Sequence, residues 1–265
     1  MIEGMSRPQL FLIDAFGFIF RAYHARARSG APPMRTSKGL STEAVFIFHN
    51  MMRKLAQTHK PEHLAVVFES AGKTFREEQF TEYKANRTEM PPDLSEQIPY
   101  VRRLLDAQRV PVLDYEGFEA DDVIGAMAKQ AVERGIDVMI VSSDKDMLQL
   151  VNEHVRMLNP MKDDTIYDIA GTEAFMGVRP DQVADLLALK GDAIDNIPGA
   201  PGIGDKGAKD LLKQFGSLKA ALERAAEVTK RTYRESLQNH QDQILLSLKL
   251  ATIHTDIPLD WSLEQ

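Results

Sequence analysis

The regular alternation of short β-rich apolar segments with longer segments of helical periodicity constrains the fold of this chain more than any other feature. Such alternation is typical of βαβ units, and it predicts an α/β fold with a mostly parallel central sheet flanked by helices. The predicted strands are 9–13 (QLFLI), 63–68 (HLAVVF), 110–113 (VPVL) and 137–142 (DVMIVS), with a weaker pair near 155–158 and 165–167.

Helical periodicity is clearest over 120–134, where Val123, Ile124, Met127 and Ala131 recur on one face. Beyond about residue 180 only helical patterns remain, so we expect an α/β core over 1–179 and a helical region over 180–265. The other predicted helices are 42–58, 94–107, 145–150, 180–190, 205–215 and 233–252.

Residues 72–93 (GKTFREEQFTEYKANRTEMPPD) differ in character from their surroundings. They are highly charged, contain few aliphatic side chains and end at a double proline. A long segment of this kind is either a mobile surface insertion or a functional element, and its length alone favours the first interpretation.

Composition narrows the chemistry that the chain can perform. The 265 residues include no cysteine, which excludes disulfides, iron–sulfur clusters and thiolate zinc sites. The apolar run LFLIDAFGFIF is interrupted by Asp14 and is too short to span a bilayer, and no signal pattern precedes it. We therefore expect a cytoplasmic protein with no membrane contact.

Acidic side chains follow each of the main predicted strands. Because the carboxyl ends of parallel strands meet at the edge where open α/β sheets hold ligands, these side chains are expected to converge. Any one of them alone is more often a helix cap or a solvated side chain, but together they indicate a site. They are Asp14, Glu69, Glu119, Asp121 and Asp122 of GFEADD, Asp144 and Asp146 of SSDKD, and Asp192 and Asp195 of KGDAIDNIPG.

Acids crowded in this way need a cation. Two carboxylates about 4 Å apart repel by roughly 4 kcal/mol at an effective dielectric constant of about 20. Oxygen ligands without cysteine or clustered histidine select Mg²⁺ or Mn²⁺, and two such ions suit phosphodiester hydrolysis. The net charge of −7 is largely local to these acids, since the rest of the chain carries slightly more basic than acidic side chains. A nucleic-acid partner is therefore not excluded.

The segment GIGDKG, residues 202–207, matches the spacing of a dinucleotide-binding fingerprint. It follows a helix and an irregular segment rather than a strand, which argues against that function. We interpret it as a glycine hairpin between two helices, where Gly202 and Gly204 leave amides able to hold a phosphate. Lys206 and Lys209 on the next helix suit a nucleic-acid backbone, although a solvated helix face gives the same pattern.

Taken together, these segments resemble the 5′ nucleases, the family of the flap endonucleases. The resemblance is closest to the 5′-to-3′ exonuclease domain at the N-terminus of bacterial DNA polymerase I, and it covers roughly residues 9–255. The blocks that carry it are LIDAFGFIFRAYHA, TFREEQFTEYKANR, GFEADDVIGAMA, VSSDKDMLQLV and LKGDAIDNIPGAPGIGDKGAKDLL.

The resemblance implies that 72–93 form a helical arch over the active site and that a helix-hairpin-helix element grips duplex DNA, with K⁺ held by hairpin carbonyls. One divalent metal would be served by Asp14, Glu69, Glu119, Asp121 and Asp122, and the other by Asp144, Asp146, Asp192 and Asp195. Lys84 and Arg87 would reach the scissile phosphate and act in catalysis with Asp14 and Asp146. Further contacts to DNA would come from Arg21, Tyr23, Tyr83, Gly202, Gly204, Lys206 and Lys209, with a tyrosine stacking on a frayed base.

The chain departs from the family pattern in two places. Glu69 stands where Asp is usual, and Asp205 and Gly207 stand where Pro and Thr are more usual. We expect a metal-dependent 5′-to-3′ exonuclease and 5′-flap endonuclease that acts on DNA flaps, nicks or frayed 5′ ends. Two other functions stay open, a DNA-structure binding protein with impaired catalysis and an acidic-site ribonuclease. A free-standing nuclease and a piece of a polymerase I, with the polymerase following in the same chain, both fit the sequence.

Overall fold

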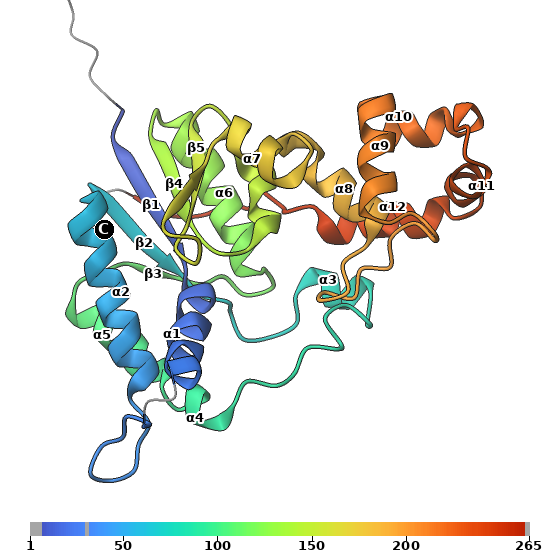
Figure 1. Cartoon of the computed structure of the whole chain (residues 1–265). Helices are drawn as coiled ribbons and strands as arrows, with labels where there is room; N and C mark the ends of the chain where they lie inside the picture. The colour runs from blue at the N-terminus through green and yellow to red at the C-terminus, as the bar shows by residue number, and fades with distance from the viewer. Residues whose placement is uncertain (1–6, 30–31, 263–265) are drawn as a thin grey trace, which may run out of the picture.

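The computed structural model describes residues 7–29 and 32–262, and within them a six-stranded sheet lies between two layers of helices (Figure 1). The outermost residues of the two expected parts, 1–6 and 263–265, lie outside this description. The strands are β1 (Gln9–Asp14), β2 (His63–Val67), β3 (Val112–Leu113), β4 (Asp137–Val141), β5 (Val155–Asn159) and β6 (Thr165–Tyr167).

The helices fall into two groups along the chain. The first group belongs to the α/β part: α1 (Ala15–Ser29), α2 (Glu43–His59), α3 (Phe75–Gln79), α4 (Pro92–Ser95), α5 (Ile98–Ala107), α6 (Ala120–Glu133) and α7 (Ile169–Met176). The second group follows it: α8 (Val183–Lys190), α9 (Asp205–Phe215), α10 (Leu218–Glu223), α11 (Arg231–Asn239) and α12 (Gln241–Ala251).

The strand order is β3-β2-β1-β4-β5-β6, and every neighbouring pair is parallel except β5 with β6. The chain leaves β1 towards β2 and β3 on one side, then crosses over to β4 on the other. The order therefore reverses between β1 and β4, and ligands of open α/β sheets bind at such a switch point. The predicted mostly parallel sheet is confirmed.

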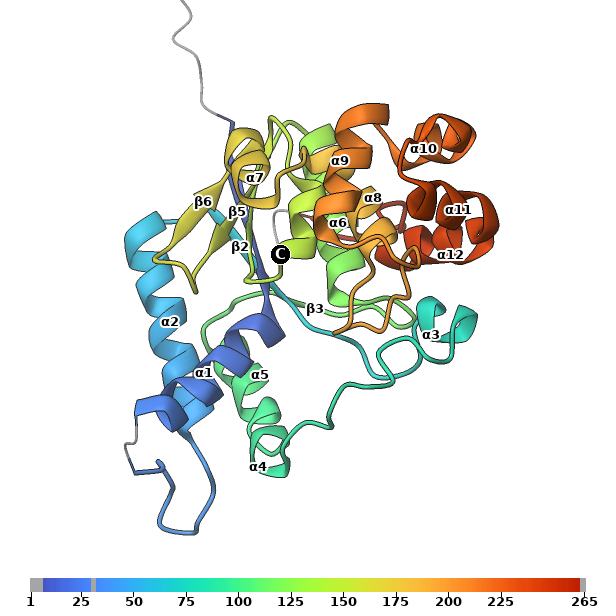
Figure 2. The same cartoon turned by 45° about the vertical axis from the view of Figure 1, so that its right-hand side comes forward.

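Alternate residues of β1 supply two separate apolar cores, because successive side chains of a strand point to opposite faces. Leu10 and Leu12 pack on the side of α6, whereas Phe11 and Ile13 pack on the side of α1, α2 and α5. Figure 2 shows these two helix layers on either side of the strands. With both faces covered, only the ends of the strands can approach a substrate.

The helical region extends the α6 core. Leu187 of α8, Leu212 of α9 and Leu237 of α11 are fully buried and belong to the same apolar cluster as Leu12 and Ile140. After α12 the chain runs back along α6 and behind the sheet, as the red trace in Figure 1 shows. The two parts of the chain therefore share one core.

The closing segment, residues 252–262, is fixed to α6 by side-chain contacts. Gln130 donates to the carbonyl oxygen of Ile257 at 2.9 Å, and the indole of Trp261 donates to Gln130 Oε1 at 2.9 Å. The Arg134 guanidinium lies 4.1 Å from the centre of the Trp261 ring. This segment ends on the side of the molecule away from the carboxyl ends of the strands.

Residues 72–93, the segment in which we expected a helical arch, form a partly helical bridge. Only α3 and α4 are helical, and the stretch between them consists of turns and extended chain, with Lys84 at a φ of 55°. Two features explain why the segment is not helical throughout. It has too few aliphatic side chains to form the apolar stripe of a packed helix, and Pro91 and Pro92 lack the amide hydrogens that a continuous helix needs.

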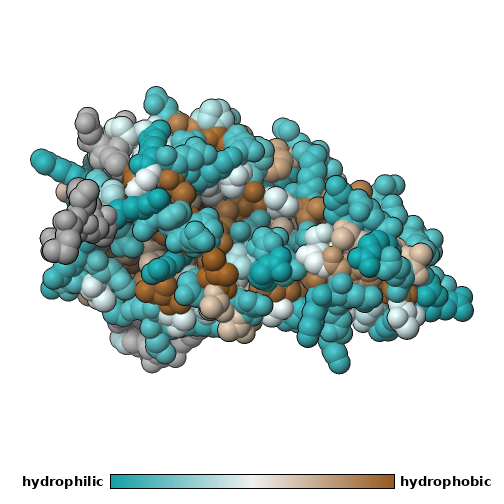
Figure 3. Space-filling model, turned by 90° about the horizontal axis from the view of Figure 1, so that it is seen from above, coloured by the Kyte–Doolittle hydropathy of each residue, from teal (hydrophilic) through white to brown (hydrophobic). Residues whose placement is uncertain are grey.

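In the described part of the chain, no helix is both long and apolar enough to cross a bilayer. The face drawn in Figure 3 is largely hydrophilic, and its apolar residues form small patches among charged ones.

Candidate active site

A cleft of about 860 Å³ opens at the carboxyl ends of β1 and β4, where the strand order reverses. Four of the nine predicted acids line it, and they come from the ends of β1 and β2, the start of α6 and the loop after β4. These acids are Asp14, Glu69, Asp121 and Asp144. The basic side chains of the same cleft are Arg21, Lys84, Arg87, Lys145 and Lys162, with His24 nearby.

Ser142 joins the ends of the two central strands. Its hydroxyl donates to Asp14 Oδ2 at 2.8 Å and accepts from the amide of Asp144 at 3.0 Å. The amide of Gly17, in the first turn of α1, donates to Asp14 Oδ1 at 3.1 Å. Burial raises the pKa of Asp14, and the nearby charge of Asp144 adds to the effect. Both carboxylates thus meet at the strand switch point, where Lys145 lines the same cleft.

The acids at the start of α6 point in different directions. Asp121 lines the cleft, and burial together with the charges of Asp144 and Asp14 raises its pKa well above the usual value. Glu119, immediately before the helix, is only 4% exposed. It accepts from Lys84 Nζ at 2.6 Å, from Arg76 Nη1 at 3.2 Å and from the Tyr83 hydroxyl at 3.2 Å.

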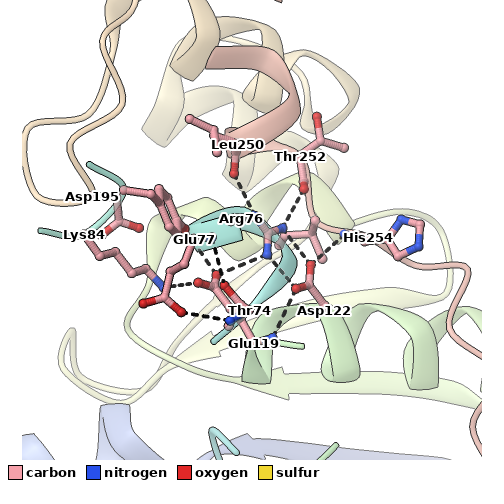
Figure 4. A network of polar contacts seen from close by, with 12 residues as sticks. Thr74, Arg76, Glu77, Lys84, Glu119, Asp122, Asp195, Leu250, Thr252 and His254 are labelled. Carbon is pink, nitrogen blue, oxygen red and sulfur yellow. Dashed lines mark hydrogen bonds and ion pairs between the residues drawn. The ribbon is translucent and has the colours of Figure 1, made fainter. Parts of the chain in front are cut away.

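Asp122 is fully buried and does not line the cleft; its carboxylate points to Arg76 (Figure 4). Its two oxygens accept from Arg76 at 2.6 and 2.7 Å, from the His254 amide at 2.8 Å and from the Glu119 amide at 3.2 Å. A carboxylate has about four lone-pair sites, so these four donors leave none for a metal. A metal at Asp122 would have to displace one of these donors, so the expected metal role of Asp122 stays a prediction.

A second acidic group lies beside the first. Asp146 directs its amide to Asp144 Oδ1 at 2.9 Å, while its own buried Oδ1 has no hydrogen-bond partner. Lys145 Nζ lies 3.3 Å from Asp146 Oδ1 and 3.1 Å from Asp192 Oδ2. Burial, with the charge of Asp144, raises the pKa of Asp146 to about 7. Lys145 thus connects the loop after β4 to the helical region.

Two side chains of the 72–93 bridge reach the cleft. Lys84 pairs with Glu119, and although burial opposes its charged form, Glu119 and Glu69 together raise its pKa. Arg87 pairs with Asp195 of the helical region through Nε at 3.1 Å. The carbonyl of Asp195 also accepts from the Lys84 amide at 3.0 Å, which ties the bridge to the helical region.

The predicted stacking residues are differently placed. Tyr83 is 5% exposed and its hydroxyl is bound to Glu119, so its ring offers no open face to a base in this arrangement. Tyr23 donates to Asp93 at 3.0 Å, outside the lining of the cleft. Arg21 lines the cleft and donates to the carbonyl oxygen of Pro160.

Glu69, the departure from the family pattern, lies on the cleft wall after β2. Burial raises the pKa of Glu69. The positive charge of Lys84 lowers that pKa, whereas the negative charges of Glu119 and Asp14 raise it further. The longer side chain therefore still reaches the acidic group.

In the part of the chain that the structure describes, no three Asp, Glu or His side chains are arranged as a ready metal site. The donor set nevertheless fits a hard divalent cation, because it consists of oxygens only. Burial is the main cause of the raised pKa values of Asp14, Asp121 and Asp146, and neighbouring carboxylates add to it, so a bound cation would favour the charged forms of these side chains.

The glycine hairpin lies at the start of α9, as expected. Gly202 has a φ of +76° and is exposed, as are Gly204 and Lys206. Lys209 Nζ pairs with Asp205 at 2.6 Å, and this hydrogen bond lowers the pKa of Asp205. Gly207 is the second hairpin residue that departs from the family pattern. A Cβ at this position would come within 2.4 Å of the Tyr233 hydroxyl, which explains why glycine is present there.

Sequence reasoning missed three residues of this site. Ser142 and Lys145 belong to the same segment, SSDKD, as the predicted acids Asp144 and Asp146. The segment was therefore identified, but only its carboxylates were predicted to belong to the site. Arg76 carries no comparable signal, because an arginine in a charged segment gives no sign that it is 2% exposed in the fold.

Residues 9–177 match the N-terminal resolvase-like domain of 5′-3′ exonucleases, and residues 178–265 match their C-terminal SAM fold. The chain belongs to the 5′-3′ exonuclease family.

Relatives include free-standing and fused forms. The chain is 37% identical to the 5′-3′ exonuclease of Aquifex aeolicus, over 96% of this chain and 85% of that protein. It is 43% identical to DNA polymerase I of Chloroflexus aurantiacus, over 98% of this chain but only 28% of the polymerase. Among solved structures, a zinc-bound T5 5′-exonuclease has the same fold, with a TM-score of 0.76 and 23% identity over 93% of this chain and 90% of that one.

Proposed function

We propose that this chain is a divalent-metal-dependent nuclease that hydrolyses DNA phosphodiesters at 5′ flaps, nicks and frayed 5′ ends. The observation that carries the proposal is the cleft at the β1/β4 switch point, where four strand-end and helix-start carboxylates face Lys84 and Arg87. DNA as the substrate is supported by a related T5 flap endonuclease, whose structure was solved in complex with DNA and metal ions.

The acids divide into two groups of ligands. Asp14, Glu69 and Asp121, with Glu119 beside them, would hold one Mg²⁺ or Mn²⁺, and Asp144, Asp146 and Asp192, with Asp195 near, would hold the other. When bound, such a pair of ions activates water and stabilises the leaving oxygen. Asp122 is left out of this set, because its four donors already occupy it.

The basic residues act on the phosphate itself. Lys84 and Arg87 stand on the cleft wall, and each is held by an acid, so they approach the scissile phosphate from fixed positions. Positive charge there stabilises the developing negative charge of the transition state. Arg21, which also lines the cleft, contributes a further positive charge. Tyr23 and Tyr83 would have to leave their acid partners before either could stack on a base.

The helical region would bind the duplex beside the cut. Gly202 and Gly204 offer amides at the start of α9, Lys206 and Lys209 offer charge, and K⁺ held by hairpin carbonyls completes the site. We place the division between the two parts near residue 180 and the enzyme in the cytoplasm. Both a fused polymerase and a free-standing nuclease remain compatible with the relatives.

One assay tests the proposal against its rivals. A 5′-labelled flap DNA and a matched RNA are incubated with the protein in Mg²⁺ and in EDTA. We expect cleavage of the DNA flap in Mg²⁺ that stops in EDTA and returns with Mn²⁺. Binding without cleavage would support the impaired binder, cleavage of the RNA alone would support the ribonuclease, and cleavage that persists in EDTA would refute metal dependence.

A further inference from the structure

Arg76 stands where three segments of the chain meet (Figure 4). It belongs to α3, at the foot of the 72–93 bridge, and its guanidinium lies between the first turn of α6 and the end of α12. The side chain is 2% exposed, which is rare for an arginine.

Every N–H of the Arg76 guanidinium has an acceptor. Two bonds of 2.6 and 2.7 Å form a bidentate pair with Asp122, and a third of 3.2 Å reaches Glu119. The remaining two, of 2.9 and 2.8 Å, go to the carbonyl oxygens of Leu250 and Thr252. An arginine has five such donors, so the geometry of this group is fully specified.

The partners of Arg76 connect the helical region to the cleft. The Leu250 carbonyl belongs to the last turn of α12, where carbonyls lack partners within the helix and the helix dipole favours a cation. On the other side, Glu119 Oε2 accepts from Arg76 while Glu119 Oε1 accepts from Lys84 at 2.6 Å. A continuous chain of hydrogen bonds therefore leads from α12 to the cationic wall of the cleft.

We infer that Arg76 and Asp122 are a positioning pair for the nuclease reaction, which fixes Glu119 and, through it, places Lys84 against the scissile phosphate. Neither residue touches the substrate or a metal. The inference rests on the proposed function, since it assigns these two residues a part in that reaction. It gives Asp122 a role different from that of the other acids of GFEADD.

The test replaces both members together. Removing one leaves a buried charge unpaired and destabilises the fold, whereas replacing both by apolar side chains of similar size is often neutral. The variant is therefore Arg76→Met with Asp122→Leu. A matched control is Lys129→Gln with Asp256→Asn, an exposed ion pair that also links α6 to the closing segment but lies outside the cleft lining.

The readouts are the single-turnover rate on a 5′ flap, flap affinity and the Mg²⁺ concentration for half-maximal rate. We expect the Arg76/Asp122 variant to bind the flap as the wild type does and, at saturating Mg²⁺, to cut roughly 100-fold more slowly, the usual cost of a misplaced catalytic group. Lys84→Ala should lower the rate far less in this variant than in the wild type, because Lys84 is already displaced there. The control variant should cut normally.

Three results would overturn the inference: a normal rate, an equal cost of Lys84→Ala in both backgrounds, or a higher Mg²⁺ requirement with an unchanged maximal rate. The last would make Asp122 a ligand. If melting curves show the pair variant unfolded, Arg76→Lys, which keeps the charge but loses the bidentate geometry, is compared in the same way. A wild type that fails to cut in Mg²⁺ would refute the proposed function instead.

Discussion

At the scale of single residues, Glu69 decides whether the departure from the family pattern alters catalysis. Glu69 lines the cleft together with Lys84, and burial raises its pKa, as it does for the other cleft acids Asp14 and Asp121. We predict that Glu69→Gln weakens Mg²⁺ binding and slows flap cleavage, though less than Asp14→Asn does, while Glu69→Asp stays active. Single-turnover rates across a Mg²⁺ titration check this. A Glu69→Gln protein identical to the wild type would remove Glu69 from the site, and an inert wild type restored by Glu69→Asp would favour the impaired binder.

Asp146 makes the stability of the metal-free protein depend on pH. Its pKa is about 7 in the fold, through burial and the charge of Asp144, against 3.8 for the free side chain. Between these values the native state holds a proton that the unfolded chain has lost, so the free energy of unfolding falls as the pH rises from about 4 to 7. Urea unfolding in EDTA at several pH values should show this fall, and Asp146→Asn should make it shallower, while the other buried acids with raised pKa values keep part of it. Equal slopes for both proteins would contradict the assignment.

At the scale of elements, the strands and the strand-end acids could be predicted, whereas the direction of each side chain could not. The GFEADD pattern placed three acids at the start of α6, but only the fold shows that Asp121 lines the cleft while Asp122 turns inward to Arg76. The reason is physical: neighbouring helix positions differ by about 100°, and a distant partner decides which of them is buried. The sequence predicted an arch over 72–93, but it could not predict the contacts of Lys84 with Asp195 and Glu119 that hold the segment in place.

The hairpin and α9 allow a prediction that separates two lysines. Lys206 is exposed, whereas Lys209 is paired with Asp205 at 2.6 Å and must break that contact to bind a phosphate. We predict that Lys206→Ala weakens duplex binding and lowers the slope of log affinity against log salt by about one, while Lys209→Ala has a smaller effect. Neither should change the single-turnover rate at saturating DNA. Salt titrations of binding measure this, and unchanged slopes for both variants would take the hairpin out of the DNA path.

At the scale of the whole molecule, the shared core makes the two parts of the chain a single cooperative unit. Trp261 is 6% exposed and packs with residues from β1 to α12 in one cluster. It is also the one tryptophan of the chain, so its fluorescence reports the closing segment while far-ultraviolet circular dichroism reports all helices. We predict coincident urea transitions by the two signals. Trp261→Ala should cost about 3 kcal/mol in the free energy of unfolding by circular dichroism, and separate transitions in the wild type would show that the parts unfold independently.

The closing segment along α6 also sets an order of events during synthesis. Gln130 and Arg134 form hydrogen bonds with Ile257 and Trp261, which lie more than a hundred residues later in the chain. Contacts of such long sequence separation slow folding and leave apolar surface uncovered until they form. A ribosome-bound chain that has not yet released residues 252–262 therefore carries an incomplete α6 face. Chaperone binding to nascent chains should fall sharply once residues 252–262 leave the exit tunnel.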